Sequence, residues 1–66
     1  MAQELIDLHF TEYDTNGKKV GGFSIGALCV PRIGEQVDSY GHRGQVTGII
    51  HNYDTNTVEI YLVRLY

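Results

Sequence analysis

The chain is poor in cysteine, proline and tryptophan. It contains one cysteine, one proline and no tryptophan among 66 residues. Because Cys29 has no second cysteine to join, an intramolecular disulfide is excluded. The chain also lacks a run of about 18 apolar residues and a basic region leading into an apolar stretch, which argues against a membrane helix and a signal peptide. We therefore expect a cytoplasmic protein, whose reducing surroundings suit an unpaired thiol.

Positive charge is scarce as well. Five lysines and arginines stand against eight carboxylates, for a formal net charge of -3. Proteins that bind nucleic acid neutralise phosphates with lysine and arginine, so this balance argues against such a partner. A domain of this size hides only about 60% of its unfolded surface, and oligomerisation is a common source of extra stability. We expect one domain over residues 1–66 that forms a homo-oligomer.

Apolar residues alternate with polar ones along most of the chain, which is the period-two pattern of half-buried strands. The residues expected to face the core are Ile6, Leu8 and Phe10 near the start and Val58, Ile60 and Leu62 near the end. In a strand over residues 45–51, Val46, Gly48 and Ile50 are expected to share one face. Paired glycines at Gly21 and Gly22 predict a bulge or bend. No helical period is present. The sequence predicts an all-β fold with about five antiparallel strands in a small Src-homology-3-like barrel or strongly curled sheet, with an oligonucleotide-binding-type barrel as the alternative.

The tetrapeptide Tyr-Asp-Thr-Asn occurs twice, at residues 13–16 and 53–56. Asp and Asn side chains can hydrogen-bond the backbone two residues on, and Asn tolerates the left-handed conformation of tight reversals. Gly17 follows the first copy, where a positive φ would close a hairpin. Both copies are therefore predicted to be hairpin tips.

No arrangement of residues in the sequence indicates a catalytic or metal site. The three histidines and the cysteine show no spacing typical of zinc ligands, so no metal and no cofactor are expected. Between Leu28 and Val30, Cys29 is interpreted as a small buried hydrophobe. The carboxylates, Glu12 among them, are scattered, and no residue is assigned a catalytic role.

One glycine-flanked loop has the composition of a ligand site. Arg32, Tyr40, His42 and Arg43 combine the planar fork that arginine offers to an anion with the stacking face of tyrosine. We predict that these four residues bind a small anionic ligand or a partner protein. An ordinary solvated loop is the alternative.

The last strand has a second apolar face. Glu59, Tyr61, Val63 and Leu65 share the parity opposite the predicted core. Such a face is predicted to form the interface of a homo-oligomer. The alternative is a central strand that is covered on both sides.

Three short stretches in the second half resemble a known family. Residues 34–37 (Gly-Glu-Gln-Val), 44–46 (Gly-Gln-Val) and 58–61 (Val-Glu-Ile-Tyr) are similar to the ordered motifs of the plasmid-borne type II dihydrofolate reductases. The resemblance implies a Src-homology-3-like barrel that assembles as a tetramer around a shared pore, with Ile60 and Tyr61 lining that pore. Glu59 stands where the family has a glutamine, and its negative charge would repel folate and the nicotinamide cofactor.

Residues 30–37 also resemble a stretch of small proteins carried by phages and mobile elements, some of which act as inhibitors or ligand sinks. Our leading hypothesis from the sequence is a non-enzymatic, homo-oligomeric binding module for a small anionic ligand or a partner protein. The alternative hypothesis is an oligomeric pore-type reductase.

Overall fold

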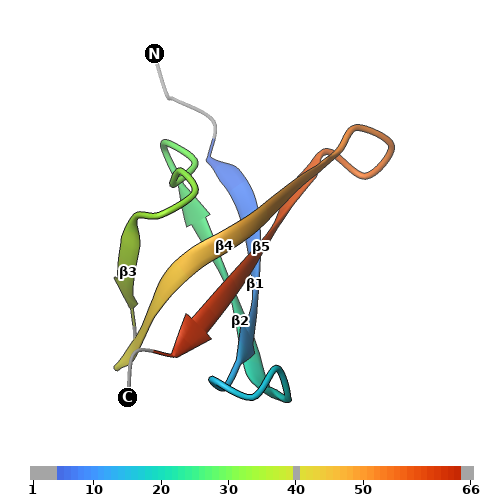
Figure 1. Cartoon of the computed structure of the whole chain (residues 1–66). Coiled ribbons are helices and arrows are strands. Elements are labelled where there is room, and N and C mark those ends of the chain that lie inside the picture. The colour runs from blue at the N-terminus through green and yellow to red at the C-terminus, as the bar shows by residue number, and fades with distance from the viewer. Residues whose placement is uncertain (1–4, 40, 65–66) are drawn as a thin grey trace.

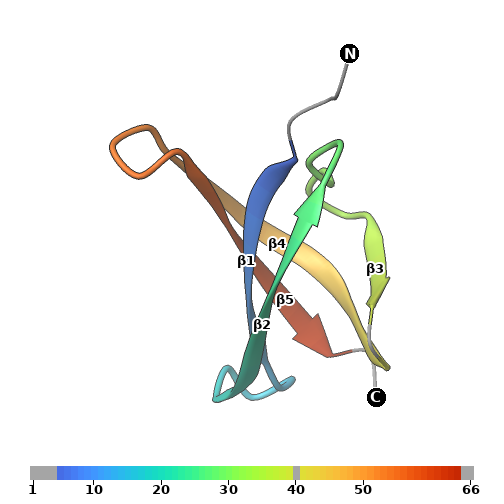
Figure 2. The same ribbon diagram turned by 180° about the vertical axis from the view of Figure 1, so that it is seen from behind.

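The computed structural model describes residues 5–39 and 41–64, and it forms one strongly curled sheet (Figure 1). Its strands are β1 (Ile6–Tyr13), β2 (Lys19–Ala27), β3 (Gln36–Ser39), β4 (His42–Asn52) and β5 (Thr57–Arg64). Their order in the sheet is β2-β1-β5-β4-β3. Seen from behind, β2 and β3 are the two edges of this half-barrel (Figure 2). The predicted all-β, barrel-like fold is confirmed, and no helix occurs among the described residues.

The pairing of the strands differs from the expectation at one place. The ladders β1·β2, β3·β4 and β4·β5 are antiparallel, as predicted, but β1 and β5 pair in parallel, with Phe10 opposite Ile60. Hairpins force antiparallel pairing on strands that follow one another. Since β1 and β5 are not joined by a hairpin, no turn fixed their relative direction, and the sequence did not reveal it.

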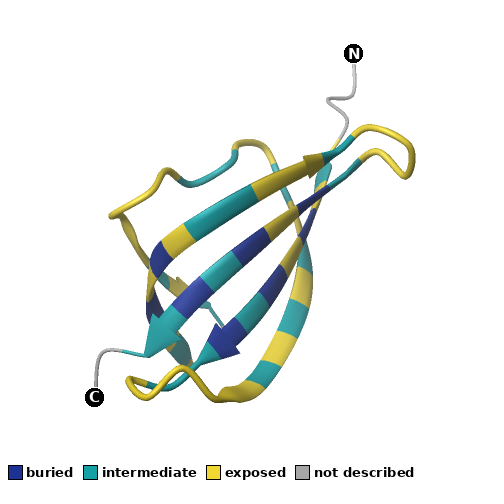
Figure 3. Cartoon of the chain, turned by 45° about the vertical axis from the view of Figure 1, so that its right-hand side comes forward, coloured by how far each residue is buried: buried dark blue, intermediate teal, exposed yellow. Residues whose placement is uncertain are grey.

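The core lies on the concave face of the sheet and is concentrated on its central strands. Its buried members are Leu8, Phe10, Val46, Val58, Ile60 and Leu62, and partly buried apolar residues, Ile6 among them, pack against it. The prediction for the first and last strands is therefore confirmed. β2 differs, because its inward side chains are only half-buried, so Figure 3 shows no fully buried residue along it. The concave face is closed over the central strands and open towards the edges.

A bulge in β4 changes which residues of that strand face the core. Val46 pairs with Leu62 and Gly48 with Tyr61, so Thr47 is an extra residue. The side chains after it change sides, and Ile49 packs against the core while Ile50 is 46% exposed. The prediction that Val46, Gly48 and Ile50 share one face was wrong, since the bulge puts Val46 on the concave side and Ile50 on the other. A bulge shifts a period-two pattern by one residue, and the sequence carries no sign of this one.

A second bulge lies next to the paired glycines, as predicted. Glu12 pairs with Gly21 and Tyr13 pairs with Lys19, which leaves Val20 as the extra residue. A Cβ atom on Gly22 would stand 2.8 Å from the carbonyl oxygen of Phe10. Strand β2 therefore approaches β1 more closely there than a side chain would allow.

Both copies of the repeated tetrapeptide are hairpin tips, as predicted, but they are built differently. At the first tip, Oδ1 of Asp14 accepts hydrogen bonds from the backbone N–H groups of Asn16 and Lys18, and Gly17 has a φ of 85°. At the second, Asn52 provides the accepting side chain, and Asn56 itself has a φ of 58°. The same four residues thus serve two different turns.

Candidate functional site

A buried carboxylate with basic partners stands at one end of the half-barrel. The side chain of Glu12, at the end of β1, lies on the concave face, where the residue is only 1% exposed. Its Oε1 lies 2.6 Å from Nδ1 of His42 at the start of β4, and its Oε2 accepts a hydrogen bond of 3.2 Å from Nε of Arg64 at the end of β5. The contact with His42 is short but is not aligned as a hydrogen bond, so Oε1 has no hydrogen-bond donor among the described residues.

Two aromatic rings also pack against this cluster, on the face of the His42 imidazole. The ring of Phe23 stacks on His42, with centroids 5.1 Å apart and planes at 20°, and Phe10 stacks on Phe23 at 4.6 Å. The imidazole of His42 is therefore fixed between an aromatic face and a carboxylate. His42 on β4 thus contacts Glu12 on β1 and Phe23 on β2, neither of which is a neighbour of β4 in the sheet. The geometry of the cluster is that of a structural clamp.

The basic residues predicted to form a binding loop do not converge. Arg32 precedes β3 and His42 follows it, so they lie at opposite ends of that strand (Figure 1). His42 and Arg43 are neighbours in a strand and therefore point to opposite faces of the sheet. On the outer face, Nη2 of Arg43 donates to Oδ2 of Asp38 at 2.9 Å. Tyr40 lies outside the described residues.

The predicted oligomer face lies on the convex side of β5. Glu59 is exposed there, while Tyr61 and Val63 are half-buried. The rings of Tyr13 and Tyr61 are in contact, with centroids 5.9 Å apart, so neighbouring strands already cover part of this face. Leu65 lies outside the described residues.

The two residues that the family resemblance assigned to a pore lie on opposite faces of β5. Ile60 is fully buried in the concave core, and Tyr61 points to the convex side. They therefore do not line one common surface.

Outside the clamp, the structure has an apolar cavity of about 390 Å³, which we call the edge groove. It lies between the two edge strands, over the uncovered part of the concave face. Its lining residues are Leu8, Phe10, Ile25, Ala27, Cys29, Val30, Pro31, Arg32, Glu35 and Val37. The expectation of a buried Cys29 was wrong, since the residue is exposed. It belongs to the connection between β2 and β3, where no neighbouring strand covers it.

The rim of the edge groove carries one residue of each charge. Oε1 of Glu35 accepts a hydrogen bond of 2.6 Å from the backbone N–H of Arg32. This bond closes the turn in front of β3. Arg32 is the predicted site residue that lies at this groove, whereas His42 belongs to the clamp.

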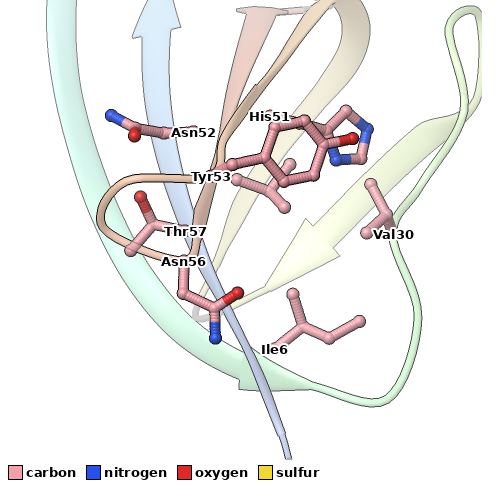
Figure 4. Close-up of a pocket in the computed structure, with 8 residues that line it drawn as sticks. Ile6, Val30, His51, Asn52, Tyr53, Asn56 and Thr57 are labelled. Carbon is pink, nitrogen blue, oxygen red and sulfur yellow. The ribbon is translucent and has the colours of Figure 1, made fainter.

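A smaller cavity of about 230 Å³, which we call the hairpin pocket, opens beside the second hairpin tip (Figure 4). It is lined by Ile6, Val30, His51, Asn52, Tyr53, Asn56, Thr57 and Val58. Val30 contributes to both cavities, so the hairpin pocket and the edge groove are neighbours.

The described part of the chain comprises residues 5–39 and 41–64. Within them, no group of three or more His, Cys, Asp or Glu residues is placed to hold a metal ion. Nor do they contain a helix of the length and apolarity needed to cross a membrane.

The fold and its cavities define a small all-β half-barrel with a groove at its open edge. Beyond that class, no known relative appears: no family model matches the chain, and neither the curated proteins nor the solved structures contain a significant match.

Sequence reasoning missed both the clamp and the groove. One signal for the clamp was present, because Glu12 continues the inward parity of Leu8 and Phe10 and therefore puts a charge on the core face. The groove had no comparable signal, since it depends on which strands become the edges.

Proposed function

We propose that this protein is a non-enzymatic binding module that captures an extended, apolar segment of a partner protein in the edge groove. The observation that carries the proposal is a groove of about 390 Å³ with an apolar floor, which opens between two edge strands. An extended segment can bind there in two ways. Its backbone can hydrogen-bond an edge strand, and every second side chain can enter the groove.

The backbone of an added segment would find partners at the edges. Among the described residues, β2 and β3 each pair with a strand on one side only. The other side of an edge strand presents unpaired N–H and C=O groups, which readily accept another strand. Here β2 offers the longer edge, from Lys19 to Ala27.

The side chains of the segment would cover apolar surface that the domain leaves open. Phe23, Ile25 and Ala27 point inward from β2 but remain half-buried, whereas Leu8 and Phe10 on the adjacent strand are buried. Removing apolar area from water is favourable by about 25 cal/mol per Å². The open side of the half-barrel is therefore the part of the molecule that gains most from a partner.

The charges favour a protein segment over a small anion. Arg43 is paired with Asp38, and both His42 and Arg64 are paired with Glu12. These three basic groups already face carboxylates, so an added anion would have to compete with them, whereas Arg32 stands at the edge groove together with Glu35. We also propose a cytoplasmic location, where the exposed thiol of Cys29 would stay reduced.

The test is a selection of peptides from a displayed random library on the immobilised protein. We expect selected sequences to share an alternation of apolar and polar residues. Ala27→Glu places a charge in the groove and should weaken binding of a selected peptide at least about tenfold, equivalent to about 1.4 kcal/mol. Ser24→Glu places the same charge on the outer face of the same strand and should leave binding unchanged.

Chemical modification of Cys29 offers a second way to obstruct the edge groove, without a mutation. A bulky maleimide on this groove-lining thiol should abolish peptide binding, whereas the same treatment of Cys29→Ser should have no effect. Peptide binding that survives both Ala27→Glu and the maleimide would contradict the proposal. Protection of Cys29 that rises with protein concentration, together with a larger mass by light scattering, would identify a second copy of the chain as the occupant instead.

A further inference from the structure

The tyrosines of the two repeated tetrapeptides have different surroundings. The ring of Tyr13 is half-buried and contacts Tyr61, so it serves the packing of the sheet. Tyr53 is 87% exposed at the tip of the other hairpin. The turn chemistry needs the Asp and Asn residues and not the tyrosine. Packing in the sheet therefore explains Tyr13, whereas most of the ring of Tyr53 remains in solvent.

Tyr53 forms one wall of the hairpin pocket. Its ring lies alongside that of His51, with centroids 6.2 Å apart and planes at 16° (Figure 4). Rings in direct contact have centroid separations of about 4.5–7 Å, so no ligand fits between these two. A ligand would instead lie against the open face of Tyr53 and above the apolar floor formed by Ile6, Val30 and Val58.

The remaining wall of the pocket is polar but uncharged. It consists of the amides of Asn52 and Asn56 and the hydroxyl of Thr57. Among the described residues, the side-chain amide of Asn56 has no hydrogen-bond partner, while Asn52 still has its NH₂ group available because the turn uses only its Oδ1. In the part of the chain that the structure describes, no lysine, arginine or carboxylate lines the pocket. An anion would meet neither lysine nor arginine there, and a purely apolar ligand would leave the amides without hydrogen bonds.

We propose that the hairpin pocket binds a neutral sugar ring. A pyranose has a C–H face that can lie on an aromatic ring and an apolar floor, and hydroxyl groups that can bond the amides of Asn52 and Asn56. The cavity of about 230 Å³ is smaller than the roughly 300–1,000 Å³ of sites for drug-sized ligands, so it matches a single ring. This site is separate from the proposed capture of a protein segment in the edge groove.

The test is a titration followed by the backbone amide resonances of the isotope-labelled protein. The probes are the methyl glycosides of glucose, galactose and mannose, and N-acetylglucosamine. We expect at least one of them to bind with a Kd of about 1 mM, which is the order for a ligand of this size at ordinary ligand efficiency. The shifts should be confined to residues 51–58, Ile6 and Val30.

Two variants separate the pocket from the rest of the surface. Tyr53→Ala removes an exposed side chain and should weaken sugar binding at least about tenfold, with the remaining amide spectrum unchanged. Ile50→Ala removes another exposed apolar side chain, from β4 outside the pocket, and should leave the Kd unchanged.

Three results would overturn the proposal. They are the absence of shifts with all four sugars, shifts that persist in Tyr53→Ala, and stronger shifts of the same amides by indole. Indole is a planar aromatic probe with a single hydrogen-bond donor, so its preference would mean that the amides of the pocket do not select for hydroxyl groups.

Discussion

Glu12 and His42 meet at one end of the half-barrel, with Oε1 and Nδ1 separated by 2.6 Å. They come from β1 and β4, which are not neighbours in the sheet, since β5 lies between them. The contact therefore spans the concave face. It stands at the end of the molecule opposite to the hairpin pocket, where β1 ends and β4 begins (Figure 1). In a sheet whose edges do not meet, a contact of this kind limits how far the sheet can open.

The two charged partners Glu12 and Arg64 are buried to different degrees, so mutating one should change the free energy of unfolding more than mutating the other. The side chain of Glu12 is 2% exposed and that of Arg64 is 40% exposed. Arg64→Gln removes the aligned donor to Oε2 of a carboxylate that water cannot reach, leaves it only the unaligned contact with His42 among the described residues, and should lower the free energy of unfolding by about 3 kcal/mol. Glu12→Gln leaves a guanidinium that water can reach and should cost about 1 kcal/mol. Urea unfolding of both variants measures the difference.

The double variant provides the control for this prediction. Once Glu12 is neutral, Arg64→Gln should cost much less than it does alone, which gives a coupling energy between the two sites. Equal effects of Arg64→Gln in both backgrounds would contradict the clamp.

The two adjacent glycines of β2 should respond differently to alanine. At Gly22 a Cβ would approach the carbonyl oxygen of Phe10 to 2.8 Å, whereas at Gly21 nothing lies within 4 Å. Gly22→Ala should therefore lower the stability by about 1–3 kcal/mol through overpacking. Gly21→Ala should leave it unchanged or raise it by up to about 1 kcal/mol, because alanine restricts the unfolded chain. Thermal unfolding followed by circular dichroism tests the pair, and a larger loss from Gly21→Ala would refute the close approach.

The bulge at Thr47 predicts which of two neighbouring isoleucines stabilises the core. Ile49 packs against the core, and Ile50 is 46% exposed. Ile49→Ala should cost about 2–4 kcal/mol, while Ile50→Ala should change the stability by less than about 0.5 kcal/mol. Chemical denaturation gives both values. The reverse order would mean that β4 has no bulge and keeps the simple alternation of its sequence.

The second hairpin tip depends on the left-handed conformation of Asn56, whose φ is 58°. Alanine is disfavoured in this region, so Asn56→Ala should lower the free energy of unfolding by about 1 kcal/mol. Glycine adopts the conformation without steric cost, and Asn56→Gly should leave the stability unchanged. At the first tip the left-handed residue is Gly17 and not Asn16. Asn16→Ala should therefore not show a conformational penalty of this kind, which makes it the matched control in the same unfolding assay.

The sequence by itself determined the class of the fold and most of its local structure. Alternating apolar residues fixed the strands and the inward faces of β1 and β5, because a strand with one buried face must repeat every two residues. The Asp and Asn residues of the repeated tetrapeptide fixed the two reversals, because their side chains bond the backbone within the turn itself. These features depend on interactions between residues that are close in the chain.

The tertiary structure decided everything that depends on residues far apart in the chain. The parallel pairing of β1 with β5 made β2 and β3 the edges, and this order created the edge groove and exposed Cys29. Because of the bulge in β4, Ile49 packs against the core and Ile50 does not. The same order of strands separated Arg32 from His42 and brought His42 to Glu12. Local patterns specify which face of a strand is buried, but the neighbours of each strand are chosen by the packing of the whole sheet.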